Sequence, residues 1–209
     1  MTLESSPDHA DVLALLEPLD AGLEPALASL RARLARDAQL THTLDVAYRV
    51  VDSPVGRLLL AATDRGIVRV AFEAENHAEV LQRLSDTISP RILQAPARLD
   101  GAARQLEEYF GGTRTEFDLT LDFRLSRGFR LNVLQHLPRI AYGRTESYAE
   151  VALAAGSPNA VRAVGTACAT NPLPVIIPCH RVVKSDGSFG GYLGGPEAKR
   201  ALLTLEAAA

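Results

Sequence analysis

The chain has 209 residues, of which 47% are hydrophobic, and a formal net charge of −3 at pH 7. This length allows one large domain or two small ones, and the composition is ordinary for a globular protein. Two cysteines without a Cys-x-x-Cys pair argue against a disulfide scaffold and a structural zinc site. The N-terminus lacks the regions of a signal peptide and no uncharged run could span a bilayer, so we expect a cytoplasmic protein with no membrane partner.

The charge is divided unevenly along the chain. Residues 124–209 contain ten Lys/Arg and five Asp/Glu, a net of +5, which leaves −8 for residues 1–123. A basic C-terminal half is compatible with phosphate contacts, although ordinary solvated charge explains it equally well.

The first part of the chain predicts a helical extension and a small α+β domain. Residues 1–43 are rich in Ala, Leu, Arg and Glu, and leucines such as Leu23, Leu30 and Leu34 recur at helical spacing, which predicts two helices of unassigned role. From residue 46 the hydrophobic period changes to two, which predicts a meander of three antiparallel strands near 46–50, 58–62 and 68–72. One helix should begin at the Asn76/Glu79 cap and another should run near 97–110, so we assign a domain to residues 44–122.

Residues 123–209 predict a mostly helical domain. After a helix near 129–138, Ser147 and Glu150 form a capping box, and Ser157-Pro158 predicts the start of the next helix. Two short helices joined at a glycine turn resemble a helix-turn-helix. The second helix carries Cys168 on a core face and Arg162 among small residues on the opposite face. Small side chains allow the close approach that a narrow minor groove requires.

The segment from Asn171 to Val183, with the sequence NPLPVIIPCHRVV, is the strongest candidate for chemistry. Its three early prolines predict an extended, stiff approach to Cys179. His180 and Arg181 follow directly and would favour a thiolate. The residues alone leave a second interpretation open, in which Cys179 is a small core residue beside a buried strand.

A loop with five glycines, residues 184–195, follows this segment and allows close approach to a flat ligand. It matches neither a P-loop nor a dinucleotide fingerprint. Pro196 opens the last helix, which carries Glu206 near its end.

Four motifs together resemble one family: Arg162-Ala-Val-Gly, Asn171-Pro, Ile177-Pro-Cys-His-Arg-Val-Val and Gly191-Tyr-Leu-Gly-Gly before a helix with a Lys-Arg pair. They are similar to the O6-alkylguanine-DNA alkyltransferases, and the resemblance covers about residues 44–207. It implies an α+β fold: a small antiparallel-sheet, ribonuclease H-like domain, then a winged-helix-like domain at 123–209 that binds DNA and holds the alkyl acceptor.

The resemblance also implies the activity and its partners. The partner would be double-stranded DNA with alkylated bases, bound through the minor groove by a monomer, with no cofactor and no metal. The damaged base would be flipped out of the duplex. Its alkyl group, from guanine O6 or less readily thymine O4, would pass irreversibly to Cys179, so each molecule acts once.

Residue roles follow from the resemblance at matching positions. Cys179 would be the acceptor, and His180, oriented by Glu206, would draw off the thiol proton through a water. Tyr148 would donate a proton near guanine N3, and Arg162 would fill the hole left by the flipped nucleotide. The DNA-binding face would comprise Asn159, Arg162, Ala163, Gly165 and Thr166, and the substrate pocket Asn171, Pro174, Val182, Tyr192, Leu193 and Gly194.

Three other functions remain open at this stage. A lesion-binding protein without transfer activity would lack the acceptor cysteine, which is present here as Cys179. A helix-turn-helix regulator would carry several polar base-reading side chains, whereas Arg162 stands almost alone. A hydrolase would need a route to release the adduct, which a thioether does not offer.

Overall fold

The computed structural model of the protein describes residues 25–38, 40–41 and 43–207, and the chain divides into two compact units, residues 1–44 and 45–209. In the first unit, residues 25–38 are helical, with Leu30 and Leu34 exposed. Leu23 and the other helix predicted in this extension lie outside the described residues. Within the part of the chain that the structure describes, no helix has the length and apolar character needed to cross a membrane.

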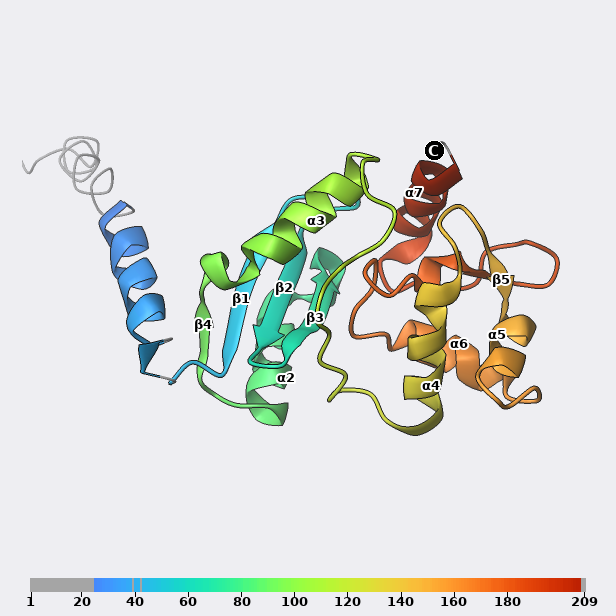
Figure 1. Cartoon of the computed structure of the whole chain (residues 1–209), viewed down its shortest axis with the longest axis horizontal. Coiled ribbons are helices and arrows are strands. Elements are labelled where there is room, and N and C mark those ends of the chain that lie inside the picture. Colours follow the sequence, from blue (N-terminus) through green and yellow to red (C-terminus); the bar gives the residue numbers. More distant parts are fainter. Residues whose placement is uncertain (1–24, 39, 42, 208–209) are drawn as a thin grey trace, which may run out of the picture. The chain divides into compact units, whose positions relative to one another are not determined.

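The second unit begins with the predicted meander. Strands β1 (Val46–Val51), β2 (Leu58–Thr63) and β3 (Gly66–Phe72) pair antiparallel in chain order, as expected from the period-two pattern (Figure 1). A fourth strand, β4 (Ile92–Gln94), lies parallel to β1 and gives the sheet order β3-β2-β1-β4. The sheet is therefore mixed rather than purely antiparallel. Three residues are too few to show a period, so this strand has no sequence signal of its own.

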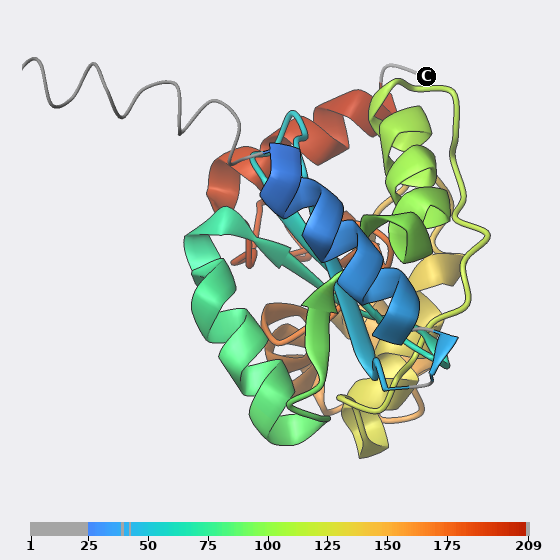
Figure 2. The same cartoon turned by 90° about the vertical axis from the view of Figure 1, so that its left-hand side faces the viewer.

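The two faces of the sheet are covered by different elements. All six residues of β2 are buried, and they alternate between two clusters. Leu59 and Ala61 pack with α2 (His77–Thr87), whereas Leu58 and Leu60 pack with η2 (Pro96–Leu99), α3 (Asp100–Phe110) and residues from the C-terminal helices (Figure 2). Alternation puts successive side chains on opposite faces, so both faces of this central strand are core.

The spacing of Leu99, Ala103, Leu106 and Phe110 predicts that the helix near 97–110 buries these four residues, and the structure confirms Leu99 and Leu106. Ala102, Gln105, Leu106 and Tyr109 are buried, whereas Ala103 and Phe110 are only partly covered. The shift places the Tyr109 ring, rather than Phe110, at the centre of the packing. Its polar end has a partner far along the chain, which a local pattern does not reveal.

The C-terminal part is mostly helical, as predicted. Its elements are α4 (Gly128–His136), η3 (Leu137–Arg139), β5 (Glu146–Ser147), α5 (Tyr148–Ala154), α6 (Val161–Ala169), η4 (Cys179–Arg181), β6 (Val182–Val183) and α7 (Gly195–Ala207). Strands β5 and β6 pair parallel, and α4, α5 and α6 pack together. The capping box at α5 is confirmed: the Glu150 amide donates to Ser147 Oγ at 3.2 Å, and the Ser147 amide donates to Glu150 Oε2 at 2.6 Å.

The predicted start of the next helix at Ser157-Pro158 is wrong. Residues 158–159 form a turn that the Ala160 amide closes on the Ser157 carbonyl at 2.9 Å, and α6 begins only at Val161. Asn159 therefore lies before the helix, and Val161 is exposed rather than core. A serine followed by proline suits a turn as well as a helix N-terminus, and here the turn is formed.

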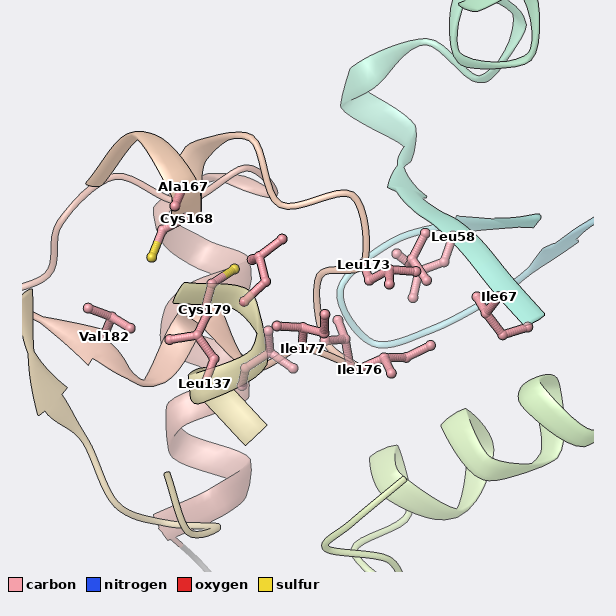
Figure 3. Close-up of a cluster of buried hydrophobic side chains, with 14 of the residues drawn as sticks. Leu58, Ile67, Leu137, Ala167, Cys168, Leu173, Ile176, Ile177, Cys179 and Val182 are labelled. Carbon is pink, nitrogen blue, oxygen red and sulfur yellow. The ribbon is translucent and has the colours of Figure 1, made fainter. Parts of the chain in front are cut away.

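A shared core joins the sheet to the C-terminal helices. Leu58 of β2 lies beside Leu173, and the cluster continues through Ile177 to Cys179 and Cys168 (Figure 3). The Val70 amide of β3 also donates to the Pro172 carbonyl at 2.8 Å. The cysteine segment is thus packed directly on the sheet. The division at residue 122 stays a prediction.

Candidate active site

The segment before Cys179 is a buried turn and not the extended approach predicted. Val175 has a φ of 72°, and the Ile177 amide donates to the Leu173 carbonyl at 2.8 Å. Every residue from 171 to 183 is buried. A proline restricts its own backbone conformation and that of the residue before it. Val175 follows Pro174 and precedes Ile176, so neither restriction keeps it from the left-handed conformation. A β-branched residue adopts that conformation only where its surroundings impose it.

Asn171 imposes this turn. Its side chain is fully buried, and its Oδ1 accepts from the Leu173 amide at 2.9 Å. Its Nδ2 donates to the Ile177 carbonyl at 3.0 Å and lies 3.2 Å from Cys179 Sγ. One side chain therefore holds both arms of the turn and gives the sulfur a hydrogen-bond donor.

Cys179 is 2% exposed, and burial raises the pKa of its thiol to about 11. The Asn171 amide and the charge of Lys199 act in the opposite direction. At neutral pH the sulfur therefore carries its proton, and a reaction that uses the thiolate needs a base.

His180 is the candidate for that base. It is fully buried, and its Nε2 lies 2.8 Å from Glu206 Oε1. Burial lowers the pKa of His180 in spite of this carboxylate, so the ring is neutral at pH 7. Because a carboxylate only accepts, Nε2 carries the hydrogen, which leaves the lone pair on Nδ1. Nδ1 is buried and has no hydrogen-bond partner among the described residues.

Glu206 accepts hydrogen bonds from four residues. Arg181 donates through Nε to Oε2 and through Nη2 to Oε1, both at 2.9 Å, the Gly143 amide donates to Oε2 at 3.3 Å, and Tyr109 donates to Oε1 at 2.6 Å. Burial raises the pKa of this carboxyl, but hydrogen bonds from His180, Arg181 and Tyr109 outweigh it and lower the pKa to about 2. Glu206 is a permanent anion that orients the histidine ring.

Arg181 does not support the sulfur, contrary to the sequence-based interpretation. Its guanidinium is bidentate to Glu206 and donates to the Ile140 carbonyl at 2.6 Å. In the 3₁₀ turn η4 the Arg181 side chain meets Glu206 together with His180, so closeness to Cys179 in sequence did not place Arg181 on the thiol.

Lys199 supplies the cation near the sulfur, and sequence reasoning missed it. It is fully buried, and its Nζ donates to the Val182 carbonyl at 2.6 Å. Burial lowers the pKa of Lys199, while negative charge on Cys179 would raise it. The available signal was spacing: Lys199, Leu202 and Glu206 recur at three and four residues, which places them on one face of α7.

Two tyrosines lie close to the cysteine and histidine. Tyr148 begins α5, and a Cβ at Gly190 would lie 2.1 Å from its hydroxyl oxygen, so only glycine fits there. Burial raises the pKa of Tyr148, with further contributions from Cys168 and Cys179, so it keeps its proton. Tyr192 packs edge-on against His180, with ring centroids 6.3 Å apart, and its hydroxyl is buried without a partner in the described part of the chain.

The remaining predicted site residues fall into two groups. Pro174 and Val182 are buried near the sulfur segment, and Leu193 and Gly194 are partly buried in the glycine loop. A Cβ at Gly194 would lie 2.7 Å from the Phe72 ring, so the loop rests on β3. The predicted DNA-binding residues are apart from this group on the outer side of α6: Arg162, Ala163 and Thr166 are exposed, Gly165 is half-buried, and Asn159 is exposed in the preceding turn. No set of three or more potential metal ligands gathers among the described residues.

Comparisons with known proteins agree with this geometry. Residues 46–123 match the family model of the 6-O-methylguanine DNA methyltransferase ribonuclease-like domain, and residues 128–208 match that of its DNA-binding domain. The methylated-DNA--protein-cysteine methyltransferase of Mycolicibacterium paratuberculosis is 41% identical over 161 residues, which cover 77% of this chain and 92% of that protein. The constitutive enzyme of that name from Bacillus subtilis is 37% identical, over 76% of this chain and 94% of its own length.

Solved structures give the same result. Mycobacterium tuberculosis OGT in complex with DNA superposes with a TM-score of 0.67 at 39% identity, covering 78% of this chain and 93% of that one. These matches extend over both parts of the second unit and include the segment around Cys179. The chain therefore belongs to the 6-O-methylguanine DNA methyltransferase family.

Proposed function

We propose that this protein repairs alkylated DNA directly, by moving the alkyl group from O6 of guanine, or less readily O4 of thymine, to Sγ of its own Cys179. The observation that carries this proposal is the buried thiol beside a neutral histidine that a carboxylate orients, inside the family's DNA-binding domain. Because the product is a thioether, each molecule reacts once.

The chemistry requires one proton to travel from the thiol to the base. His180 Nδ1 takes the Cys179 proton through a water, and the thiolate attacks the alkyl carbon. The carbon–oxygen bond breaks as the carbon–sulfur bond forms, and the purine leaves as an anion. Tyr148 protonates the purine near N3, and His180 returns the proton to restore the tyrosine. The thiol proton thus ends on guanine, and no oxidant or cofactor is consumed.

The electrostatics of the site support this sequence of events. A thiol with a pKa of about 11 is unreactive until a base acts on it, which limits alkylation by other electrophiles. Once formed, the thiolate has the Asn171 amide at 3.2 Å and the buried Lys199 cation nearby.

The substrate pocket is the second part of the site. Asn171 and Pro174 shape the turn, and backbone groups near Cys179 and Val182 contact the guanine edge. Tyr192, Leu193 and Gly194 close the pocket around the alkyl group.

Helix α6 is the element we assign to the minor groove. Its outer face carries Arg162 beside Ala163, Gly165 and Thr166, and the turn before it carries Asn159. Small side chains let the helix backbone approach the groove, and Arg162 fills the hole that the flipped nucleotide leaves. A monomer suffices for the reaction, because Cys179, His180 and Glu206 belong to one chain.

The test is intact mass with peptide mapping after incubation with a duplex that contains one O6-methylguanine. We expect one added methyl group on Cys179 and one lesion lost per protein, no transfer by Cys179→Ser, and normal transfer by Cys168→Ser. Binding to the lesion without a mass change would identify a recognition protein instead. Methylation of Cys168 would overturn the assignment of the acceptor.

A further inference from the structure

Of the described residues that donate a hydrogen bond to Glu206, only Tyr109 comes from the sheet-bearing part of the chain. It lies on α3, 97 residues before Glu206 in sequence, and its hydroxyl donates to Glu206 Oε1 at 2.6 Å. Helices α3 and α7 lie at the same end of the second unit in Figure 1. The contact therefore links the ribonuclease-like part directly to the group that orients His180.

The position of the hydroxyl is tightly defined. The Tyr109 side chain is fully buried, and its ring packs against three aromatic rings: Phe110 at 5.4 Å, Phe117 at 5.2 Å and Tyr142 at 6.0 Å between centroids. Burial first, then the Glu206 charge, raise the pKa of Tyr109 far above its usual range. The hydroxyl therefore stays protonated at neutral pH and acts as a donor there.

Tyr109 and His180 share one oxygen. Both donate to Oε1 of Glu206, at 2.6 and 2.8 Å, and the two donor atoms are 3.5 Å apart. Arg181 Nη2 also donates to this oxygen, at 2.9 Å. Each further strong hydrogen bond leaves less charge on the oxygen for the other donors, so Tyr109 weakens the stabilisation that Glu206 gives to protonated His180. A less stabilised imidazolium means a histidine that remains neutral to lower pH.

We propose that Tyr109 is a positioning residue of the transfer reaction: its hydroxyl shares Glu206 Oε1 with His180 and thereby sets how readily His180 accepts and returns the thiol proton. This inference rests on the proposed function and adds a residue that no motif around Cys179 contains. Tyr109 acts through Glu206 and does not itself touch the reacting atoms.

The variant Tyr109→Phe removes the hydroxyl and keeps the packed ring. His180 and Arg181 still donate to Oε1, so Glu206 keeps partners and the variant should fold. The matched control is Tyr142→Phe, which removes a hydroxyl from the same aromatic cluster. That hydroxyl contacts only the Leu205 carbonyl, at 3.5 Å, among the described residues.

The first measurement is the single-turnover rate of methyl transfer between pH 5 and pH 9. In Tyr109→Phe, Glu206 stabilises protonated His180 more strongly, so the acid limb of the profile should move to higher pH by roughly half a unit or more. Tyr142→Phe should keep the wild-type profile. An unchanged acid limb in Tyr109→Phe, with only its melting temperature lowered, would mean that the hydroxyl is merely structural and would overturn the inference.

The second measurement does not depend on transfer. Nitrogen-15 NMR of histidine, with the His180 signals assigned by comparison with His180→Gln, reports its protonation directly in the free protein. We expect the His180 titration to move upward in Tyr109→Phe and not in Tyr142→Phe. If the wild type transfers no methyl group, the proposed function fails, whereas an unmoved His180 titration in Tyr109→Phe defeats the inference alone.

Discussion

Glu206 is the residue on which most of the site's polar contacts converge. It is almost fully buried, and donors from Tyr109, Gly143, His180 and Arg181 surround its two oxygens. A buried carboxylate is tolerated only when its lone pairs are satisfied, because an unpaired buried charge costs several kcal/mol. Removing one partner should therefore lower the stability of the folded protein as well as disturb the orientation of His180.

The depressed pKa of Glu206 predicts a stability change in acid. Because the pKa is about 2 in the folded protein and 4.5 for a free side chain, the stabilisation is complete above pH 4.5 and is lost as the pH falls toward 2. The wild type should lose on the order of 3 kcal/mol of unfolding free energy in this range relative to Glu206→Gln. Urea unfolding between pH 6 and pH 2 measures the difference.

Glu197→Gln is the control for this measurement. Glu197 lies exposed on the same helix, and among the described residues its side chain pairs only with Arg200, so the substitution leaves the Glu206 contacts intact. It should follow the wild-type pH dependence. If the unfolding free energies of the wild type and Glu206→Gln changed in parallel with pH, the Glu206 carboxyl would titrate in the folded protein as it does in a free side chain.

At the scale of single elements, α6 combines a buried side with an outer side of small residues. Val164, Ala167 and Cys168 are buried, whereas Arg162, Ala163, Thr166 and Ala169 are exposed. Gly165 has helical geometry without a positive φ, and a Cβ built there meets no atom within 4 Å. Packing within the described part of the chain therefore does not require glycine at this position.

Gly165→Leu tests the role of this helix. Leucine is the better helix former by up to about 1 kcal/mol, so the melting temperature should stay the same or rise. The larger side chain should block close approach to the minor groove and weaken binding to lesion-containing duplex by at least about tenfold. Fluorescence anisotropy with a labelled duplex measures the affinity.

Gly101→Leu is the matched control, because Gly101 is an exposed helical glycine on α3 with equally open surroundings. It should leave DNA affinity unchanged. Equal affinities for Gly165→Leu and the wild type would mean that α6 does not enter the groove.

At the scale of the whole molecule, the site lies entirely within the second compact unit. The contacts that shape it come from β3, α3, α6 and α7, and all of them belong to residues 45–209. The family models also begin at residue 46. The sheet-bearing part contributes a core shared with the cysteine segment and is thus a structural component of the active site.

A chain of residues 45–209 should therefore fold and transfer a methyl group at the rate of the full chain. Circular dichroism and the single-turnover assay check this expectation. A chain of residues 123–209 should fail in both, because it lacks Tyr109, the Val70 contact with Pro172 and the apolar partners of Leu173. Loss of transfer on removing residues 1–44 would show that the extension takes part in the reaction.

Much of the local structure was predictable from sequence. The strands at 46–51, 58–63 and 66–72 follow from a period of two, and the start of α5 follows from the Ser147/Glu150 capping box. The motif around Cys179 identified the family, and the role that it implies for His180 stays a prediction. These signals involve residues close together in the chain, where backbone geometry alone sets their spacing.

Only the tertiary structure decided how the polar groups are paired. It turned Arg181 toward Glu206, buried Lys199 behind the thiol, bent the chain at Val175 and brought Tyr109 to Glu206 across 97 residues. These contacts form because buried donors and acceptors must pair once water is excluded. Packing between elements that are distant in sequence decides which donor lies next to which acceptor. The sequence by itself determined the family, the acceptor cysteine that its motif carries and most of the surrounding elements, whereas the folded core determined which charged groups lie around them.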